Sequence, residues 1–394
     1  MALLSAGSGP TGDRLAAGFL VIASLGAAQG AGSIAYGSLP PLLPHYVLLL
    51  RLSVSAAGLL SACFGIGALV GVLPACISAG RNPRSTALAG LLILALSTAI
   101  IAWSTGKVEI EIARMGQGFG DSFAGVGALT STFQAAPTSR RSEAFGVVNT
   151  LAIVGSFLGP ALAVAAGEWG TRWVFSAGAL GIALLGGSTL WIPRRLESAG
   201  SAGYLVKCVV RALAQPGTLP LALQAALGGL LATLAPLRLA NAGWSPTAVA
   251  ALFLAGAVLA AICYRRVGRR SDERGERAVT VELLFASAFG AGLLALGSRW
   301  VLGPMLSLDA AVISLLSIPT ISRLYDPSQS KSPHGSSSAL VFAIWAMFNV
   351  AGALGAGFVA AVIGTSLPFV LAMFVCLTVI FFELRPQPRP ADRP

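Results

Sequence analysis

Residues 59–79 read LLSACFGIGALVGVLPACISA, an apolar run without a charged side chain. A helix of about 20 such residues is long enough to cross the hydrocarbon core of a bilayer. Similar runs recur along the chain of 394 residues, of which 55% are hydrophobic and only 10% are charged. Soluble domains carry about a quarter charged residues. The composition therefore excludes a cytosolic enzyme, a secreted disulfide scaffold and a disordered regulator, and it predicts a polytopic helical membrane protein.

Clusters of Pro, Gly, Ser and charged residues divide the chain into predicted membrane spans. We expect an all-α fold with twelve transmembrane helices at 15–40, 53–75, 86–105, 110–133, 144–167, 171–193, 218–240, 246–265, 278–298, 300–322, 338–363 and 366–384. The basic stretch 194–217 separates six spans from six. It predicts an N-terminal six-helix bundle (1–193), a cytoplasmic linker, either flexible or helical on the membrane surface (194–217), a C-terminal six-helix bundle (218–384) and a cytoplasmic tail (385–394).

The net charge of +11 is distributed unevenly between the predicted loops. Most of the Lys and Arg residues fall in loops on one side of the membrane, and basic loops remain on the cytoplasmic side. Both termini are therefore predicted to be cytoplasmic, and the charge does not indicate nucleic acid. The density of Ala and Gly suggests a cell inner membrane. The five cysteines are scattered and the two histidines lie apart. This pattern supports no metal site and no disulfide framework.

The loop after the eighth predicted span contains Gly268, Asp272, Gly275 and Arg277. This spacing resembles the loop motif of the major facilitator superfamily, which follows spans two and eight. The resemblance implies two pseudo-symmetric bundles around a cavity that opens alternately to each side, with this loop as a gating latch. The first-half copy departs from the motif, because Ala75 stands where the Asp is usual. The alternative is that this loop is a short basic segment that only stops membrane insertion and has no role in gating.

The fourth predicted span carries Glu111, Arg114, Gln117 and Asp121 on or beside one helical face. Charged groups in the hydrocarbon layer are costly and should face protein or a water-filled cavity. The string from Arg114 to Gly120 resembles the fourth-span motif of the superfamily, whose Arg is linked to proton transfer. We therefore predict that Asp121, with Arg114, couples transport to protons. The alternative is a static pair of Arg114 with Asp121 or with Glu111.

Span ten, the counterpart of span four, carries Asp309 in mid-span. It is predicted either as a second proton or cation site or as a cap for a helix kinked near Pro304. Other polar or aromatic residues are candidates for the substrate cavity, although packing or hydrogen bonding between helices is the more common role for such residues in spans. These candidates are Gln117, Gln29, Tyr36, Gln224, Trp345 and Asn349.

The fifth predicted span contains Gly146, Gly155, Gly159, Pro160 and Ala163. Their spacing resembles the antiporter motif of drug/proton exchangers in the superfamily. Small residues four apart form a smooth ridge for close helix packing, and proline bends a helix. The motif implies an exporter with a hinge at this span. The alternative is an ordinary packing face.

Together these resemblances imply a secondary active transporter. We expect a monomeric, proton-coupled antiporter that exports amphipathic or lipophilic small molecules, driven by the proton gradient without a cofactor. One alternative is an importer or facilitator of a small organic anion, with Arg114 as the anion site. Another is a non-transporting sensor or assembly protein. No spacing of Ser, His or paired carboxylates indicates an enzyme.

Overall fold

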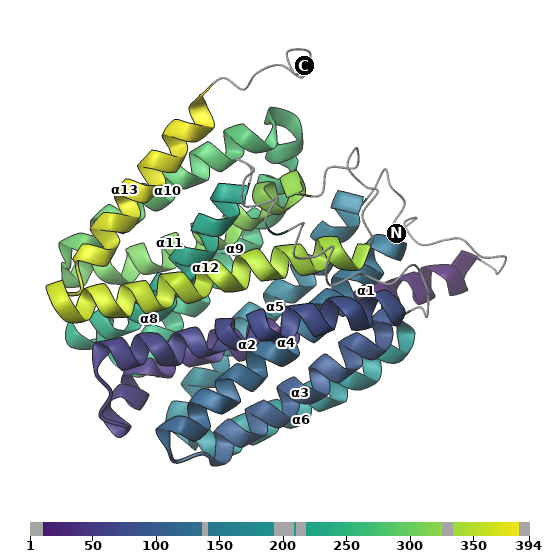
Figure 1. The fold of residues 1–394 in the computed structure, drawn as a ribbon, viewed down its shortest axis with the longest axis horizontal. Helices are drawn as coiled ribbons and strands as arrows, with labels where there is room; N and C mark the ends of the chain where they lie inside the picture. Colours follow the sequence, from purple (N-terminus) through teal and green to yellow (C-terminus); the bar gives the residue numbers. More distant parts are fainter. Residues whose placement is uncertain (1–10, 136–140, 193–208, 210–217, 325–333, 386–394) are drawn as a thin grey trace.

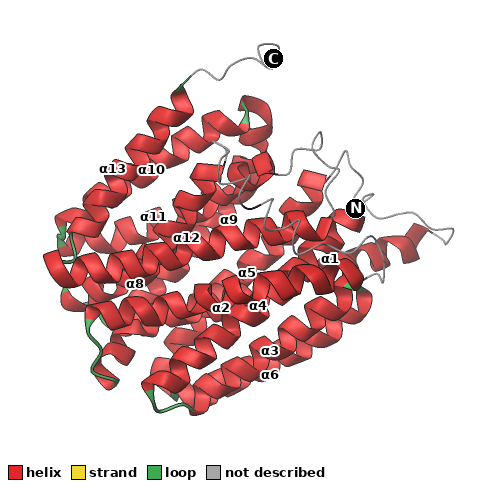
Figure 2. Cartoon of the chain, viewed as in Figure 1, coloured by secondary structure: helices red, strands yellow, loops and turns green. Residues whose placement is uncertain are grey.

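A computed structural model describes residues 11–135, 141–192, 209, 218–324 and 334–385. Within this part of the chain the regular structure is entirely helical (Figure 2). The helices are α1 (Thr11–Leu49), α2 (Val54–Arg81), α3 (Pro83–Trp103), α4 (Lys107–Ala135), α5 (Arg141–Trp169), α6 (Thr171–Ser188), the short 3₁₀ turn Thr189–Trp191, α8 (Leu219–Asn241), α9 (Pro246–Arg274), α10 (Glu276–Leu296), α11 (Arg299–Leu324), α12 (His334–Ile363) and α13 (Leu367–Leu384).

The twelve long helices correspond to the twelve predicted spans. In the described part of the chain, nine helices are long and apolar enough to cross a membrane. The first helix differs most from its prediction, because α1 continues through Pro40, Pro41 and Pro44 to Leu49. Proline removes a backbone donor and kinks a helix, and membrane helices tolerate this. The predicted linker, apart from residue 209, and the tail beyond Arg385 lie outside the described residues.

The helices of the two halves pack in the same pattern. In the first half α1 packs on α5, α2 on α4, and α3 on both α4 and α6. In the second half α8 packs on α12, α9 on α11, and α10 on both α11 and α13. The halves meet along two seams, α2 against α12 and α5 against α9 (Figure 1). The fold is therefore two pseudo-symmetric six-helix bundles.

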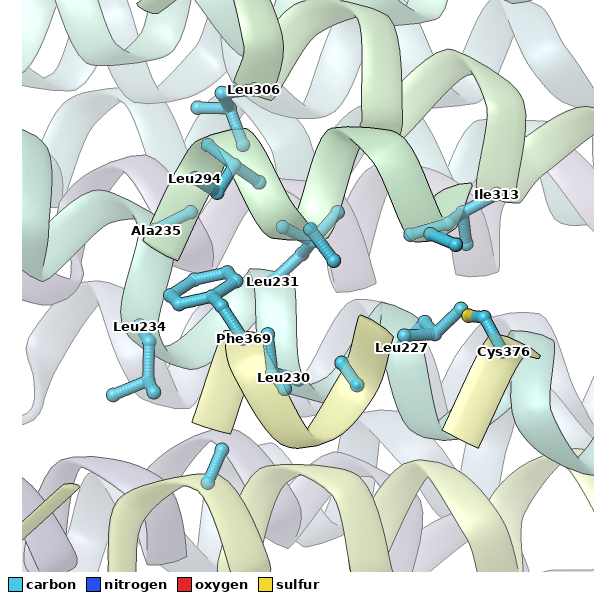
Figure 3. Packing of buried hydrophobic residues seen from close by; sticks show 14 of the residues in the cluster. Leu227, Leu230, Leu231, Leu234, Ala235, Leu294, Leu306, Ile313, Phe369 and Cys376 are labelled. Atoms are coloured by element: carbon cyan, nitrogen blue, oxygen red, sulfur yellow. The ribbon is translucent and has the colours of Figure 1, made fainter. Parts of the chain in front are cut away.

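The apolar core of the C-terminal bundle is centred on α8. Leu227, Leu230 and Leu231 lie in one cluster with Phe369 and Cys376 of α13 (Figure 3). Large apolar side chains on the outside, such as Leu184 and Phe358, remain exposed. Exposed apolar side chains all around a helical bundle are what contact with lipid requires.

One end of the molecule is closed by side chains from both bundles. We call the face where α1 begins and α13 ends the terminal face, and the other the opposite face. Towards the opposite face, Leu39 and Leu42 of α1 share an apolar cluster with Leu237 of α8 and Ala250 of α9. This cluster seals the space between the bundles on that side.

Candidate functional site

A cavity of about 380 Å³ lies between the two bundles. Its walls come from α1, α4 and α5 on one side and from α8, α9, α11 and α12 on the other. The contribution of α12 comes from its first half, that of α8 from its first half and its middle, and that of α11 from its middle and its second half. The cavity therefore extends from the centre of the molecule towards the terminal face. Its volume is in the range of ligand pockets.

The cavity wall is mostly apolar and aromatic. Tyr36, Phe253, Phe342 and Trp345 all contribute to it. Among the described residues that line the cavity, Asp121 is the only one with a formal charge. A single carboxylate in such a wall dominates its electrostatics, because little else there can compensate the charge.

Asp121 projects from α4 against Gly32 of α1. A side chain at position 32 would overlap the Asp121 carboxylate, so the glycine leaves room for it. The residue is 9% exposed and lines the cavity. Its carboxylate makes no hydrogen bond or ion pair with any residue of the described ranges. It is therefore open to neutralisation by a solute.

Arg114, two turns earlier on α4, is not among the cavity-lining residues. Its guanidinium donates hydrogen bonds of 2.7 Å to the Ala35 carbonyl and 2.7 Å to Gln117 Oε1, and it lies 4.9 Å from the Phe64 ring centroid. The side chain is 2% exposed. Neither static ion pair considered from the sequence, Arg114 with Asp121 or Arg114 with Glu111, forms in this structure. Arg114 is held by the two hydrogen bonds above, and Glu111 pairs with Lys107 at 3.6 Å.

The other candidate cavity residues divide into two groups. Gln29, Tyr36, Gln224 and Trp345 line the cavity. Gln117 and Asn349 are not among the lining residues. The Gln117 amide donates to Thr98 Oγ1 at 2.9 Å, and the Asn349 amide donates to the Tyr36 hydroxyl at 2.9 Å. Both amides are held by protein partners and hold helices together.

Asp309 lies within the C-terminal bundle, outside the cavity lining. It is 2% exposed, and a side chain at Gly290 of α10 would come within 3.0 Å of its carboxylate. Its neighbours Ala310 and Ile313 face the cavity, so Asp309 points the other way, into the packing between α11 and α10. The sequence predicts that Asp309 lies at mid-span depth, but it does not indicate the direction in which its side chain points.

The small residues of α5 pack directly against α1. A side chain at Gly155 would overlap the backbone of Gly30, and one at Gly159 would come within 2.9 Å of the Ile34 carbonyl oxygen. Pro160 is buried and lines the cavity, and Ala163 packs in the cluster that seals the opposite face. Gly146 lies on the same helix, nearer the terminal face.

The second-half loop motif is mostly helical. Gly268 and Asp272 belong to α9, whose exposed end is supported by an Arg269–Glu273 pair, and only Gly275 forms the turn, at φ 87°. The prediction that all four motif residues form a loop is therefore wrong for Gly268 and Asp272, which belong to α9, and for Arg277, which belongs to α10. Asp272 is exposed and bonds to no residue in the described ranges, so the expected latch is not engaged here.

Arg277 instead takes part in an ion-pair cluster at the terminal face. It lies 3.6 Å from Glu383, and Arg323 donates to both carboxylate oxygens of Glu383 at 3.1 and 3.2 Å. Glu383 is only 4% exposed. The cluster joins α10, α11 and α13, and the sequence analysis missed Glu383 altogether. An acid near the end of an apolar span is the one signal that pointed to it.

Ala75, which replaces the usual Asp in the first half, is completely buried within α2. It packs with Val72 and Cys76 of the same helix and with Ala339 and Ala343 of α12. At this seam the two bundles are therefore joined by methyl groups instead of a charged latch.

Two six-helix bundles that enclose a central cavity define a membrane transport protein of the two-bundle class. The chain belongs to the Major Facilitator Superfamily, whose sequence profile matches residues 25–331. The protein is thus a membrane transporter of small molecules and not an enzyme. Among the described residues, no group of three or more His, Cys, Asp or Glu side chains is placed to hold a metal ion.

Several solved transporters share the fold at low sequence identity. The xylose transporter XylE from E. coli, in a partially occluded inward-open conformation, has a TM-score of 0.75 and 14% identity over 95% of this chain and 98% of its own. The human organic anion transporter MFSD10 (TETRAN) has a TM-score of 0.70 and 18% identity over 95% and 100%. An inward-facing bacterial homolog of the human lysosomal transporter Spinster has a TM-score of 0.70 and 15% identity over 96% and 97%. A search of curated proteins finds no match.

Proposed function

We propose that the protein is a proton-coupled antiporter that exports amphipathic or lipophilic small molecules by alternating access. One observation carries the proposal: the only charged residue among the described cavity-lining residues is an acid, Asp121, and it has no counter-ion in the described protein. The apolar and aromatic wall around it suits a lipophilic body.

An unpaired carboxylate in a mostly apolar cavity is costly unless something neutralises its charge. A proton and the cationic group of a substrate compete for the same oxygens. Each would displace the other, so inward movement of protons would drive outward movement of substrate. We further propose that both termini are cytoplasmic, in a cell inner membrane, which would make the terminal face the cytoplasmic side, and that the protein acts as a monomer.

Arg114 lies outside the cavity lining, and in this scheme it positions α1 next to Asp121. Its hydrogen bond to the Ala35 carbonyl fixes α1 one turn beyond Gly32, the residue that faces Asp121. Asp309 remains our second candidate for proton binding. Because it lies outside the cavity lining, we expect its neutralisation to affect coupling less than that of Asp121.

The alternative function is uptake of a small organic anion bound by Arg114. The contacts of Arg114 disfavour it, since its guanidinium is 2% exposed and already bonded to Ala35 and Gln117. An anion would have to displace both partners before it could bind.

The test is transport by the purified full chain in liposomes with an imposed pH gradient. Lipophilic cations, neutral drugs and organic acids are compared as substrates. We expect Asp121→Asn to abolish pH-dependent cation efflux, Asp309→Asn to reduce it less, and the control Glu111→Gln on the same helix to preserve it. Anion uptake that is lost in Arg114→Ala but retained in Asp121→Asn would establish the alternative. No transport of any substrate would overturn both.

A further inference from the structure

The cavity wall opposite Asp121 holds a second group of polar side chains. Gln224 of α8, Tyr264 of α9 and Ser317 of α11 all line the cavity. All three belong to the C-terminal bundle, whereas Asp121 belongs to the N-terminal bundle. The cavity is therefore bordered by a charged pole on one bundle and a neutral polar group on the other.

These two poles lie at the same depth. Leu221, Ile321 and Val341 share one apolar cluster, so α8, α11 and α12 are level at that point. Gln224 and Ser317 follow one turn further into the molecule, on α8 and α11 respectively.

On the other wall, Gly125 of α4 packs against the ring of Phe342 of α12. Asp121 lies one turn deeper on α4, and Trp345 lies one turn deeper on α12. Since Phe342 follows directly after Val341, Asp121 is level with Trp345, and hence with Gln224 and Ser317. A solute at this depth would contact both poles.

Gln224 carries an unused hydrogen-bonding group. It is 9% exposed, and its Oε1 atom is buried without a hydrogen-bond partner among the described residues. A buried polar atom without a partner costs free energy, and a bound ligand removes that cost if it supplies the missing donor. The amide nitrogen of Gln224 donates to no described residue either, so the whole amide is available to a hydroxyl on the ligand, which can both donate and accept.

The neighbouring hydroxyls extend this polar group. Ser317 donates its hydrogen to the Ser314 carbonyl at 2.7 Å, and its oxygen lies 2.9 Å from the Tyr264 hydroxyl, in a bond in which either oxygen can be the donor. The amide of Gln224 adds two N–H donors and one acceptor, so this part of the C-terminal wall is polar without being charged.

We infer that Gln224, Tyr264 and Ser317 form a neutral hydrogen-bonding subsite, and that the substrate is an organic cation with a second, neutral hydroxyl group. The inference rests on the proposed function, because it takes the cavity as the substrate site. The cationic nitrogen lies at Asp121 and the hydroxyl lies at Gln224, so one molecule bridges the two bundles.

The test compares two series of permanently charged probes in liposomes containing the full chain. One series is n-alkyltrimethylammonium ions, and the other carries a terminal hydroxyl on alkyl chains of the same lengths. We expect the hydroxyl to improve transport efficiency by about tenfold at one chain length, the length that spans the two poles. Shorter and longer chains should gain less.

Variants separate the subsite from the rest of the site. Gln224→Leu should remove the hydroxyl preference, measured as the ratio of the transport efficiencies of the two series, and a size-exclusion profile like that of the unmodified protein shows that the variant folds. Tyr264→Phe should reduce the preference. The control Thr233→Val lies on the same helix, and its hydroxyl donates to its own backbone at Gly229 instead of lining the cavity. This control should preserve the preference.

The contrary outcomes are distinct. Transport of both series without a hydroxyl preference in the unmodified protein, or a preference that survives in Gln224→Leu, overturns the subsite and leaves the antiporter proposal standing. Failure to transport either series overturns the cationic substrate class, and the subsite with it.

Discussion

The side-chain amide of Asn349 donates a 2.9 Å hydrogen bond to the hydroxyl of Tyr36, so one side-chain pair joins the two bundles beside the cavity. The Tyr36 ring also lies edge-on to Trp345, with ring centroids 5.5 Å apart. A transporter that separates and rejoins its bundles must break and remake such contacts. This pair is therefore a sensitive point for both stability and conformational change.

Tyr36→Phe should lower the stability of this structure by about 1 kcal/mol, because it removes the hydroxyl and keeps the ring. Thermal unfolding in detergent measures the effect. The matched control is Tyr46→Phe, since Tyr46 is also buried on α1 but makes no hydrogen bond with the described residues. Equal shifts in the two variants would show that the hydroxyl bond contributes nothing.

Arg114→Lys should destabilise the protein by about 2 kcal/mol despite keeping the charge. A lysine ammonium cannot reproduce the planar fork that reaches the Ala35 carbonyl and Gln117 while stacking over Phe64. Thermal unfolding and yield of folded protein report the change. The comparison is Arg81→Lys, an exposed arginine in the last turn of α2 that we expect to tolerate the exchange. An Arg114→Lys variant as stable as the unmodified protein would contradict the role of Arg114 in positioning α1.

Gly155→Ala should disrupt the packing of α1 against α5, because the added methyl group overlaps the backbone of Gly30. We expect loss of most folded protein or of most transport activity. Gly167→Ala on the same helix is the control, since a methyl group there meets no atom within 4 Å. Size-exclusion profiles and transport rates distinguish the two variants, and a normal Gly155→Ala protein would refute the close contact.

Glu383→Gln should destabilise the terminal end of the C-terminal bundle by about 3 kcal/mol, since Arg323 and Arg277 would lose their shared buried acid. Glu273→Gln removes an exposed pair with Arg269 and should leave the unfolding temperature unchanged. Thermal unfolding of both variants in the same detergent provides the comparison. Equal unfolding temperatures for the Glu383→Gln and Glu273→Gln variants would mean that the buried ion-pair cluster adds no stability.

The spans and their grouping were predictable because hydrophobic length and loop composition are properties of the sequence itself. The match is close for the ninth span, predicted at 278–298 and observed as Glu276–Leu296. It is poorer for the eighth, predicted to end at 265, because α9 continues to Arg274 in an exposed basic segment. Arginine is a good helix former, so the charged residues at which the predicted span ends do not end the helix itself.

Side-chain directions were less predictable, since they depend on contacts between distant segments. Asp121 and Asp309 are both mid-span acids in the sequence, yet one lines the cavity and the other faces Gly290. The partner of Arg114 is a backbone carbonyl on another helix, a group that no residue type reveals. Helical periodicity gives a face of one helix, whereas packing decides what that face meets.

The seam around Ala75 has a consequence for how the surroundings act on the protein. Methyl groups there replace an acid, so mobile ions have no charge at that contact to screen. The strength of this contact should therefore be the same in dilute and concentrated buffer. Bilayer thickness remains as an external influence, because a mismatch with the hydrophobic length of α2 and α12 is accommodated in part by a change of their tilt, which alters the fit of their small side chains.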